Sequence, residues 1–269
     1  MKAVSKIYVA LVFTILYIPI LVLVLFSFNS TANTGDLTGL SLYWYRELFN
    51  SPDTFNALKN TLILAISASV ISTVIGTAAA VGITKFKKNF TRNTVLSLTN
   101  VPMMNPDIVT GISMMLLFVF IGNFTMSADK LGFGTLLIAH VTFCLPYVIL
   151  SVRPKILQMN KALPEAAMDL GCTPLMSFFK VELPNIMSGV VSGFILAFTL
   201  SLDDFVISYF TTGNDFQTLP LLIYSMTKKE VKPDIYALST LMIAAVTVLL
   251  LLSNISSKGK TAERKAALK

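Results

Sequence analysis

Six long apolar segments alternate with shorter polar stretches along the chain. They lie near residues 7–28, 61–84, 95–121, 134–152, 186–210 and 235–254. Each segment is about long enough to cross the ~30 Å hydrocarbon core of a bilayer as a helix. The pattern therefore predicts an all-α membrane protein with six transmembrane helices, folded as a single domain over residues 1–269.

The composition agrees with this pattern and excludes several classes of protein. Hydrophobic residues make up 54% of the 269 positions and charged residues 13%, which is too apolar for a soluble domain of this length. A net charge of +7 would favour nucleic-acid binding in a soluble protein, but the basic residues here fall between apolar spans. We therefore expect membrane lipid around the chain and no nucleic acid. The first apolar run is too long for a signal-peptide core, so we interpret residues 7–28 as the first span.

The basic residues also predict the orientation of the chain. With six spans both termini lie on one side, and that side carries 15 of the 21 Lys and Arg residues. Cytoplasmic loops carry such an excess, so we expect both termini and the polar loop at 153–185 to be cytoplasmic. Lys228, Lys229 and Lys232 are a local exception on the other side.

The loop at 153–185 is the longest polar interruption on the basic side. Pro164 suits the first turn of a helix, and Gly171 supplies a natural stop. Thr173 followed by Pro174 is typical of an N-cap and the first residue of a second short helix, which we expect Pro184 to close. The sequence thus predicts a helix, a hinge and a helix outside the bilayer.

The third span is interrupted by prolines and polar residues. Pro102, Asn105, Pro106 and Asp107 fall at membrane depth, with Asp107 ~18 Å along a helix that starts at Val95. Broken backbone at that depth must be satisfied by protein or by a water-lined cavity, although a simple proline kink is the alternative. Because an intramembrane carboxylate is energetically costly, Asp107 is a functional candidate.

The fifth span carries a second acidic interruption. Asp203 and Asp204 are adjacent within an apolar run. Neighbouring residues of a helix point ~100° apart, so we expect one of the two to face any given cavity. A structural cap or salt bridge is the alternative for either carboxylate. Phe205 and Tyr209 could add aromatic faces along the same path.

Three other features receive structural interpretations. Residues 42–49 combine aromatic and polar side chains and predict an amphipathic helix at the membrane interface. Gly189 and Gly193 have the spacing that permits close packing of helices in lipid. His140 is the only histidine, and we interpret it as a packed, hydrogen-bonding residue of the fourth span.

No motif of a catalytic or nucleotide-binding site is present in the sequence. It contains no Gly-rich phosphate loop, no nucleophile elbow and no metalloprotease motif. Cys144 and Cys172 form no ligand cluster, so we expect neither a metal site nor a disulfide. The chain is therefore predicted not to be an enzyme and to hold no cofactor of its own.

An ordered pattern in the polar loop resembles the coupling motif of importer-type ABC permeases. The pattern is Glu-Ala-Ala, three residues, Gly, nine residues, an aliphatic residue, one residue and Leu-Pro. Its positions here are Glu165, Ala166, Ala167, Gly171, Val181, Leu183 and Pro184. The family usually has Ile where this chain has Val, which keeps the apolar bulk. The runs at 106–108 and 200–205 are similar to those of polyamine permeases of the spermidine/putrescine kind.

The resemblance implies a type I ABC importer permease fold and a role in ATP-driven import of polyamines across a bacterial inner membrane. It implies a homologous second permease subunit, two ATPase subunits that bind ATP and Mg, and an extracytoplasmic substrate-binding protein. The residues expected to couple to the ATPase subunits are Glu165, Ala166, Ala167, Gly171, Leu183 and Pro184. The residues expected along the substrate path are Asp107, Asp203, Asp204, Phe205 and Tyr209.

The charge of the substrate agrees with this expectation, because carboxylates and aromatic faces offset the desolvation of ammonium groups. Three alternatives stay open at this point. The chain could be an ABC permease for a metal cation, an oxyanion or an amino acid. It could be an ATP-independent secondary transporter or channel, which would leave the Glu-Ala-Ala loop without a purpose. An integral-membrane enzyme is the third, and the absence of a catalytic cluster argues against it.

Overall fold

The computed structural model describes residues 2–31, 38–86, 88–125, 131–213, 216–228 and 234–248, with side chains from Lys6 onward. The described chain is helical, and its only β pairing is an isolated bridge between Asn29 and Leu40. The predicted all-α class is therefore confirmed. The chain divides into two compact units, which we describe separately.

The first unit comprises residues 1–58 and 219–250. Its helices are α1 (Lys2–Phe26), α2 (Tyr43–Asn50), α11 (Leu219–Thr227) and a helix over Asp234–Val248. A small core joins α2, α11 and the last helix through Leu48, Leu222 and Leu238. The amphipathic helix predicted at 42–49 is present as α2, and Trp44 Nε1 donates to Asn29 O at 2.8 Å.

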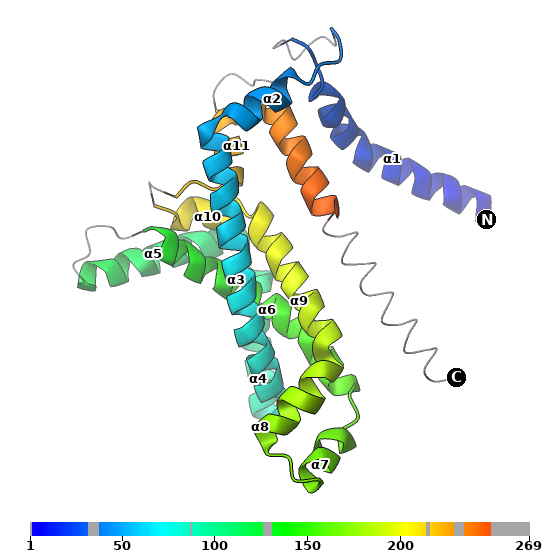
Figure 1. Ribbon diagram of the computed structural model, residues 1–269, viewed down its shortest axis with the longest axis vertical. Coiled ribbons are helices and arrows are strands. Elements are labelled where there is room, and N and C mark those ends of the chain that lie inside the picture. Colours follow the sequence, from blue (N-terminus) through cyan, green and yellow to red (C-terminus); the bar gives the residue numbers. More distant parts are fainter. Residues whose placement is uncertain are drawn as a thin grey trace. The chain divides into compact units, whose positions relative to one another are not determined.

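The second unit contains residues 59–218 and carries both candidate regions. Most of α3 (Pro52–Lys85) belongs to it. It continues with α4 (Asn89–Met104), α5 (Asp107–Thr125), α6 (Phe133–Gln158), α7 (Ala162–Asp169), α8 (Pro174–Ser177), η1 (Phe178–Glu182), α9 (Leu183–Asp203) and α10 (Val206–Thr211). In Figure 1, α5 runs crosswise to α3 and α9, while α7 and α8 lie together at one end of this unit.

The packing of α6 against α9 forms the centre of the second unit. Buried side chains between them include Val148, Val152 and Ala197. A Cβ built on Gly189 would lie 2.9 Å from Ser151 O, and one on Gly193 would lie 3.3 Å from Val148 Cγ1. The close helix packing predicted from the glycine spacing is thus confirmed, since the two backbones leave no room for a larger residue at Gly189.

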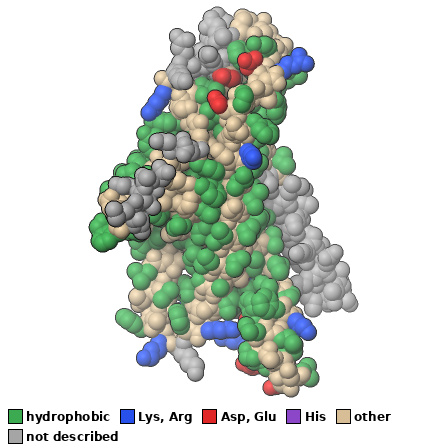
Figure 2. Space-filling view, turned by 60° about the vertical axis from the view of Figure 1, so that its left-hand side comes forward, with side chains coloured by type: hydrophobic (Ala, Val, Ile, Leu, Met, Phe, Trp, Pro, Cys, Tyr) green, Lys and Arg blue, Asp and Glu red, His purple; other side chains and the backbone are tan. Residues whose placement is uncertain are grey.

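By length and composition, five described helices could cross a membrane. They are Lys6–Phe26, Pro52–Lys85, Asp107–Phe124, Phe133–Gln158 and Pro174–Asp203. The helix over Asp234–Val248 matches the start of the sixth predicted span, whose remainder lies outside the described residues, as do Lys229, Lys232 and the tail. Figure 2 shows hydrophobic side chains spread over much of one face, on which few charged side chains are visible.

Two predicted spans are broken rather than continuous. The span at 95–121 divides into α4 and α5 at Asn105 and Pro106, because Pro106 lacks an N–H and forces Asn105 into an extended conformation with ψ 143°. Pro102 lies inside α4 without ending it. The span at 186–210 divides into α9 and α10, with Asp204 extended at ψ 121°.

Candidate functional site

The first candidate region is the α7–η1 segment, residues 162–182, which contains the Glu-Ala-Ala motif. α7 begins at Ala162, whose N–H donates to Asn160 Oδ1 at 3.0 Å. Pro164 lies in the first turn, as the sequence predicts. The helix starts two residues earlier than Pro164 because Asn160 supplies the acceptor for its first N–H.

α7 ends in a Schellman motif at Gly171. The N–H of Gly171 donates to Met168 O at 2.9 Å, and the N–H of Cys172 donates to Ala167 O at 3.0 Å. Gly171 has a φ of 90°, and a Cβ there would meet nothing within 4 Å. The predicted stop is confirmed, and the requirement for glycine comes from the backbone conformation alone.

The predicted second short helix is also present. Thr173 Oγ1 accepts from the N–H of Met176 at 3.3 Å, and Pro174 is the first residue of α8. The buried hydroxyl of Ser177 donates to Pro164 O at 3.2 Å. α8 is thereby tied to the first turn of α7, and the two helices form a connected pair.

Pro184 does not close the second helix, so that prediction is wrong. The helical backbone continues from Pro174 to Asp203. In the π-helical turn η1, the N–H of Leu183 donates to Phe178 O, five residues back instead of four. This wider turn gives the ring of Pro184 room that a regular α-helical turn would deny it.

Most of the predicted coupling residues lie on the surface of the second unit. Glu165, Ala166, Gly171 and Pro184 are exposed, whereas Ala167 and Leu183 are partly buried. Large apolar side chains accompany them on the same segment. Leu170, Leu175 and Phe179 are 88%, 73% and 61% exposed. An exposed apolar surface on a polar connection is typical of a protein interface.

One acidic side chain of the segment points inward. Glu182 is buried in η1, and its Oε1 lies 3.6 Å from Nζ of Lys85. Lys85 is the last residue of α3, where a positive charge complements the helix dipole. The ion pair therefore connects the end of α3 to the base of the α7–η1 segment.

The second candidate region is the broken-helix site, formed by the α4–α5 break, the α9–α10 break and Tyr209. Asp107 and Asp203 are exposed in the isolated chain. The side chain of Asp204 is only 7% exposed, and its carboxylate accepts from the N–H of Ile207 at 3.4 Å and of Ser208 at 2.8 Å. The two adjacent carboxylates thus have different surroundings, as expected, and Asp204 caps α10.

The structure brings the two breaks together although about a hundred residues separate them in sequence. α5 and α10 pack against each other, and a Cβ on Gly111 would lie 2.9 Å from Phe210 Cδ2. The same Cβ position on Gly111, one turn beyond Asp107, lies 3.4 Å from Val206 O at the start of α10. The rings of Phe205 and Tyr209 have centroids 5.5 Å apart at the same place.

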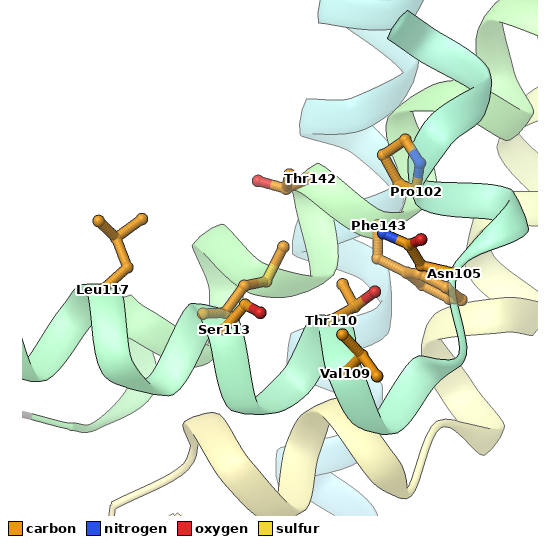
Figure 3. A pocket seen from close by; sticks show the side chains of 9 residues that line it. Pro102, Asn105, Val109, Thr110, Ser113, Leu117, Thr142 and Phe143 are labelled. Carbon is orange, nitrogen blue, oxygen red and sulfur yellow. The ribbon is translucent and has the colours of Figure 1, made fainter.

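A cavity of about 220 Å³ lies at the α4–α5 break, between α4, α5 and α6. Its lining is mostly apolar and includes four polar side chains. The lining residues are Pro102, Asn105, Val109, Thr110, Ser113, Met114, Leu117, Thr142 and Phe143. Figure 3 shows Asn105 at the α4–α5 break, near the ring of Phe143 from α6. The cavity is therefore lined by residues from both halves of the broken span.

His140 belongs to the broken-helix site, although the sequence alone led us to interpret it only as a packed, hydrogen-bonding residue. It is fully buried, and its two ring nitrogens contact Ser201 in α9 and Ser208 in α10. A signal was present in the sequence, because both serines lie close to Asp203 and Asp204. Periodicity alone could not show that α6 places the histidine between them.

The described residues contain no group of three or more His, Cys, Asp or Glu that could hold a metal ion. Cys144 is buried and Cys172 partly exposed, and both are free thiols. The arrangement of charged and aromatic groups at the broken-helix site suits recognition of a cation better than covalent chemistry.

Comparisons with known proteins identify the family. Residues 72–258 match the family described as binding-protein-dependent transport system inner membrane component. The chain is 40% identical to the putrescine transport system permease protein PotI of Escherichia coli K12, over 88% of this chain and 84% of that protein. It is 36% identical to the spermidine/putrescine transport system permease protein PotC of the same organism, over 93% and 92%.

Solved structures show the same fold at low sequence identity. A bacterial ABC transporter that imports alginate contains a chain with a TM-score of 0.74 and 16% identity, covering 96% of both chains. A chain of the MetNI methionine ABC transporter has a TM-score of 0.62 and 16% identity, covering 78% of this chain. The predicted ABC importer permease fold is therefore confirmed. The chain belongs to the family of binding-protein-dependent transport system inner membrane components, as a non-catalytic, multi-pass membrane permease homologous to those of polyamine ABC importers.

Proposed function

We propose that the chain is the permease subunit of an ATP-driven importer of polyamines such as putrescine and spermidine. The observation that carries the proposal is the packing of α5 on α10, which brings together the helix breaks that contain Asp107, Asp203 and Asp204. The names of the curated relatives support the substrate class. The solved structures are too distant in sequence to bear on it.

The acidic residues have two different roles in this proposal. Asp107 and Asp203 are exposed and bind ammonium groups directly, because a carboxylate offsets the desolvation of a cation. Asp204 caps α10, and its negative charge attracts the same ammonium groups without contacting them. Phe205 and Tyr209 offer ring faces to the same cations.

The cavity at the α4–α5 break suits the rest of such a substrate. A polyamine has methylene chains between its ammonium groups, and the mostly apolar lining favours those chains. Asn105, Thr110 and Ser113 supply oxygens that can accept from N–H groups. A multiply charged cation with an apolar backbone fits this combination better than an anion does.

Coupling to ATP hydrolysis is assigned to the α7–η1 segment. Its exposed apolar side chains and Glu165 form a surface for an ATPase subunit, as the Glu-Ala-Ala motif implies. In this proposal two ATPase subunits bind ATP and Mg, a homologous permease completes the pore, and an extracytoplasmic binding protein delivers the solute. The chain itself holds no cofactor.

The same assignment requires the α7–η1 segment and both termini to be cytoplasmic. Cys172 is partly exposed within the segment, and Cys144 is buried. An impermeant thiol reagent applied outside intact cells should therefore leave Cys172 unmodified in a Cys144→Ala variant. Rapid modification of Cys172 from outside would overturn the orientation.

Uptake of labelled polyamine tests the substrate proposal. Asp107→Asn and Asp203→Asn should each weaken uptake of spermidine and putrescine by about 1–3 kcal/mol, the scale of a charge-assisted hydrogen bond. Subunit abundance and basal ATP hydrolysis should stay near parental values. Uptake of an unrelated amino acid is the comparison. Unchanged polyamine uptake in both variants would contradict the acidic path and leave only the generic permease function.

A further inference from the structure

A continuous chain of polar groups crosses the α9–α10 break inside an otherwise apolar core. His140 Nδ1 lies 2.8 Å from Ser201 Oγ, in the last turn of α9. His140 Nε2 lies 3.0 Å from Ser208 Oγ, in α10. The exposed fractions of His140, Ser201 and Ser208 are 0%, 2% and 0%. One side chain from α6 therefore bridges both sides of the break.

The donors and acceptors along this chain can be assigned in one consistent way. Nε2 of His140 also lies 3.5 Å from Oδ2 of Asp204, and a carboxylate can only accept a hydrogen bond. The ring proton is therefore placed on Nε2, and Ser208 Oγ accepts from it at 3.0 Å. Nδ1 is left as an acceptor for the hydroxyl of Ser201. His140 thus links Ser201 of α9 to Ser208 of α10, whose backbone N–H donates to the carboxylate of Asp204 at 2.8 Å.

A second contact shows how firmly α6 holds α10. Thr135 Oγ1 in the first turn of α6 shares its one proton between Gly132 O at 2.9 Å and Thr211 O, at the last residue of α10, at 3.0 Å. α10 is therefore fixed to α6 at its end by Thr135 and near its start by His140. α10 also packs on α5, which begins with Asp107. The placement of α10 consequently sets the spacing between Asp107, Asp203 and Tyr209.

We propose that His140 is a positioning residue of the polyamine path, acting through Ser208 on Asp204 and α10 without touching the substrate. This inference takes its substrate from the proposed function, whereas the contacts of His140 do not depend on which substrate is transported. Loss of the contacts made by His140 should alter the apparent affinity for a polyamine, because the spacing of the side chains that bind the polyamine changes. Coupling through the α7–η1 segment should be unaffected, because none of its groups takes part.

Two substitutions of His140 separate positioning from mere packing. The amide of Gln can place a polar atom near the position of Nε2, whereas that of Asn reaches only the position of Nδ1. In the assembled transporter, His140→Asn and Ser208→Ala should each raise KM for putrescine about tenfold, the scale of one buried hydrogen bond. His140→Gln should stay within about threefold of the parent, and basal ATP hydrolysis should not change.

Cys144→Ala is the matched control. Cys144 lies one turn from His140 on α6, is equally buried and donates its thiol to Ala197 O of α9 at 3.4 Å, but it does not reach the break. The Cys144→Ala variant should leave KM for putrescine at the parental value. The combination His140→Asn with Ser208→Ala should be no worse than either change alone, because both interrupt the same line of hydrogen bonds.

The outcomes are distinct. A parental KM for Ser208→Ala, which removes one hydroxyl, would overturn the proposal even if His140→Asn fails to assemble. An equal rise in KM for His140→Asn, His140→Gln and Cys144→Ala would also overturn the proposal and indicate a general packing effect.

If the parental transporter takes up no putrescine, the proposed substrate has failed instead. The thiol reactivity of a Tyr209→Cys variant, with and without Ser208→Ala, then decides the positioning role: a severalfold change in rate supports it, and no change contradicts it.

Discussion

The α7–η1 segment and the broken-helix site lie at opposite ends of α9 and are built on different physical grounds. Those ends are ~30 Å apart at the rise of a 21-residue helix. The α7–η1 segment is exposed and closes its hydrogen bonds locally, through a Schellman motif, an N-cap and a hydroxyl contact between two short helices. The broken-helix site is held by buried side chains from α6, α9 and α10 and by the packing of α5 on α10.

The two regions therefore tolerate different substitutions. The α7–η1 segment depends on backbone conformation at a few positions, while its surface stays open to a partner. The broken-helix site depends on the mutual packing of helices, so changes far from its carboxylates can alter it. Variants that act on packing, on local backbone or on a single ion pair should therefore affect the two regions unequally.

The largest effect on stability is expected at the contact of α6 with α9, because both regions depend on this contact. Gly189→Ala places a Cβ 2.9 Å from Ser151 O and should destabilise the fold by about 1–3 kcal/mol through overpacking. Gly82→Ala is the control, because its Cβ would meet nothing within 4 Å in α3. Thermal unfolding of the purified subunit should show a lower Tm for Gly189→Ala only. Equal Tm values would contradict the close α6–α9 contact.

A smaller effect, confined to one region, is expected at Gly171. A β-branched side chain disfavours its φ of 90°, so Gly171→Val should cost about 1–2 kcal/mol locally and tilt α8. Transport should fall while the subunit still inserts. Gly171→Asn is the matched control, since Asn tolerates the left-handed region better, and it should retain most transport. Parental import and ATP hydrolysis in Gly171→Val would remove the coupling assignment.

The smallest effect is expected at the ion pair between Lys85 and Glu182. Lys85 is 64% exposed, so the pair should contribute only about 0–1 kcal/mol. A double-mutant cycle with Lys85→Ala and Glu182→Gln, read by thermal unfolding, measures this coupling energy. Raising the salt concentration should shrink it further. A coupling energy of several kcal/mol would show that the base of the α7–η1 segment is as tightly held as the broken-helix site.

The sequence predicted the α7–η1 segment well because its signals are local. Gly171, Thr173 and Pro174 each act within a few residues, so their effects on the backbone follow from their chemistry. The error at Pro184 arose because a π-helical turn, which accommodates the ring, has no simple sequence signature.

The broken-helix site was predicted only in part. Pro106 marked the first break, because backbone without its hydrogen bonds is costly at membrane depth. The second break was not predicted, and Asp203 and Asp204 were noted only as costly carboxylates within a continuous helix. The meeting of the two breaks and the role of His140 depend on contacts between residues 61 and 68 positions apart, such as His140 with Ser201 and Ser208. No periodicity in one segment encodes such contacts.

The central claim is that the two regions carry separable roles, coupling at one end of α9 and cation recognition at the other. The most direct test measures putrescine uptake and ATP hydrolysis together in the reconstituted transporter carrying Gly171→Val or Asp203→Asn. We expect Gly171→Val to lower the number of putrescine molecules imported per ATP hydrolysed while KM stays parental. We expect Asp203→Asn to raise KM while that ratio stays parental. If both variants change the same parameter, the two regions do not have separate roles and the account is contradicted.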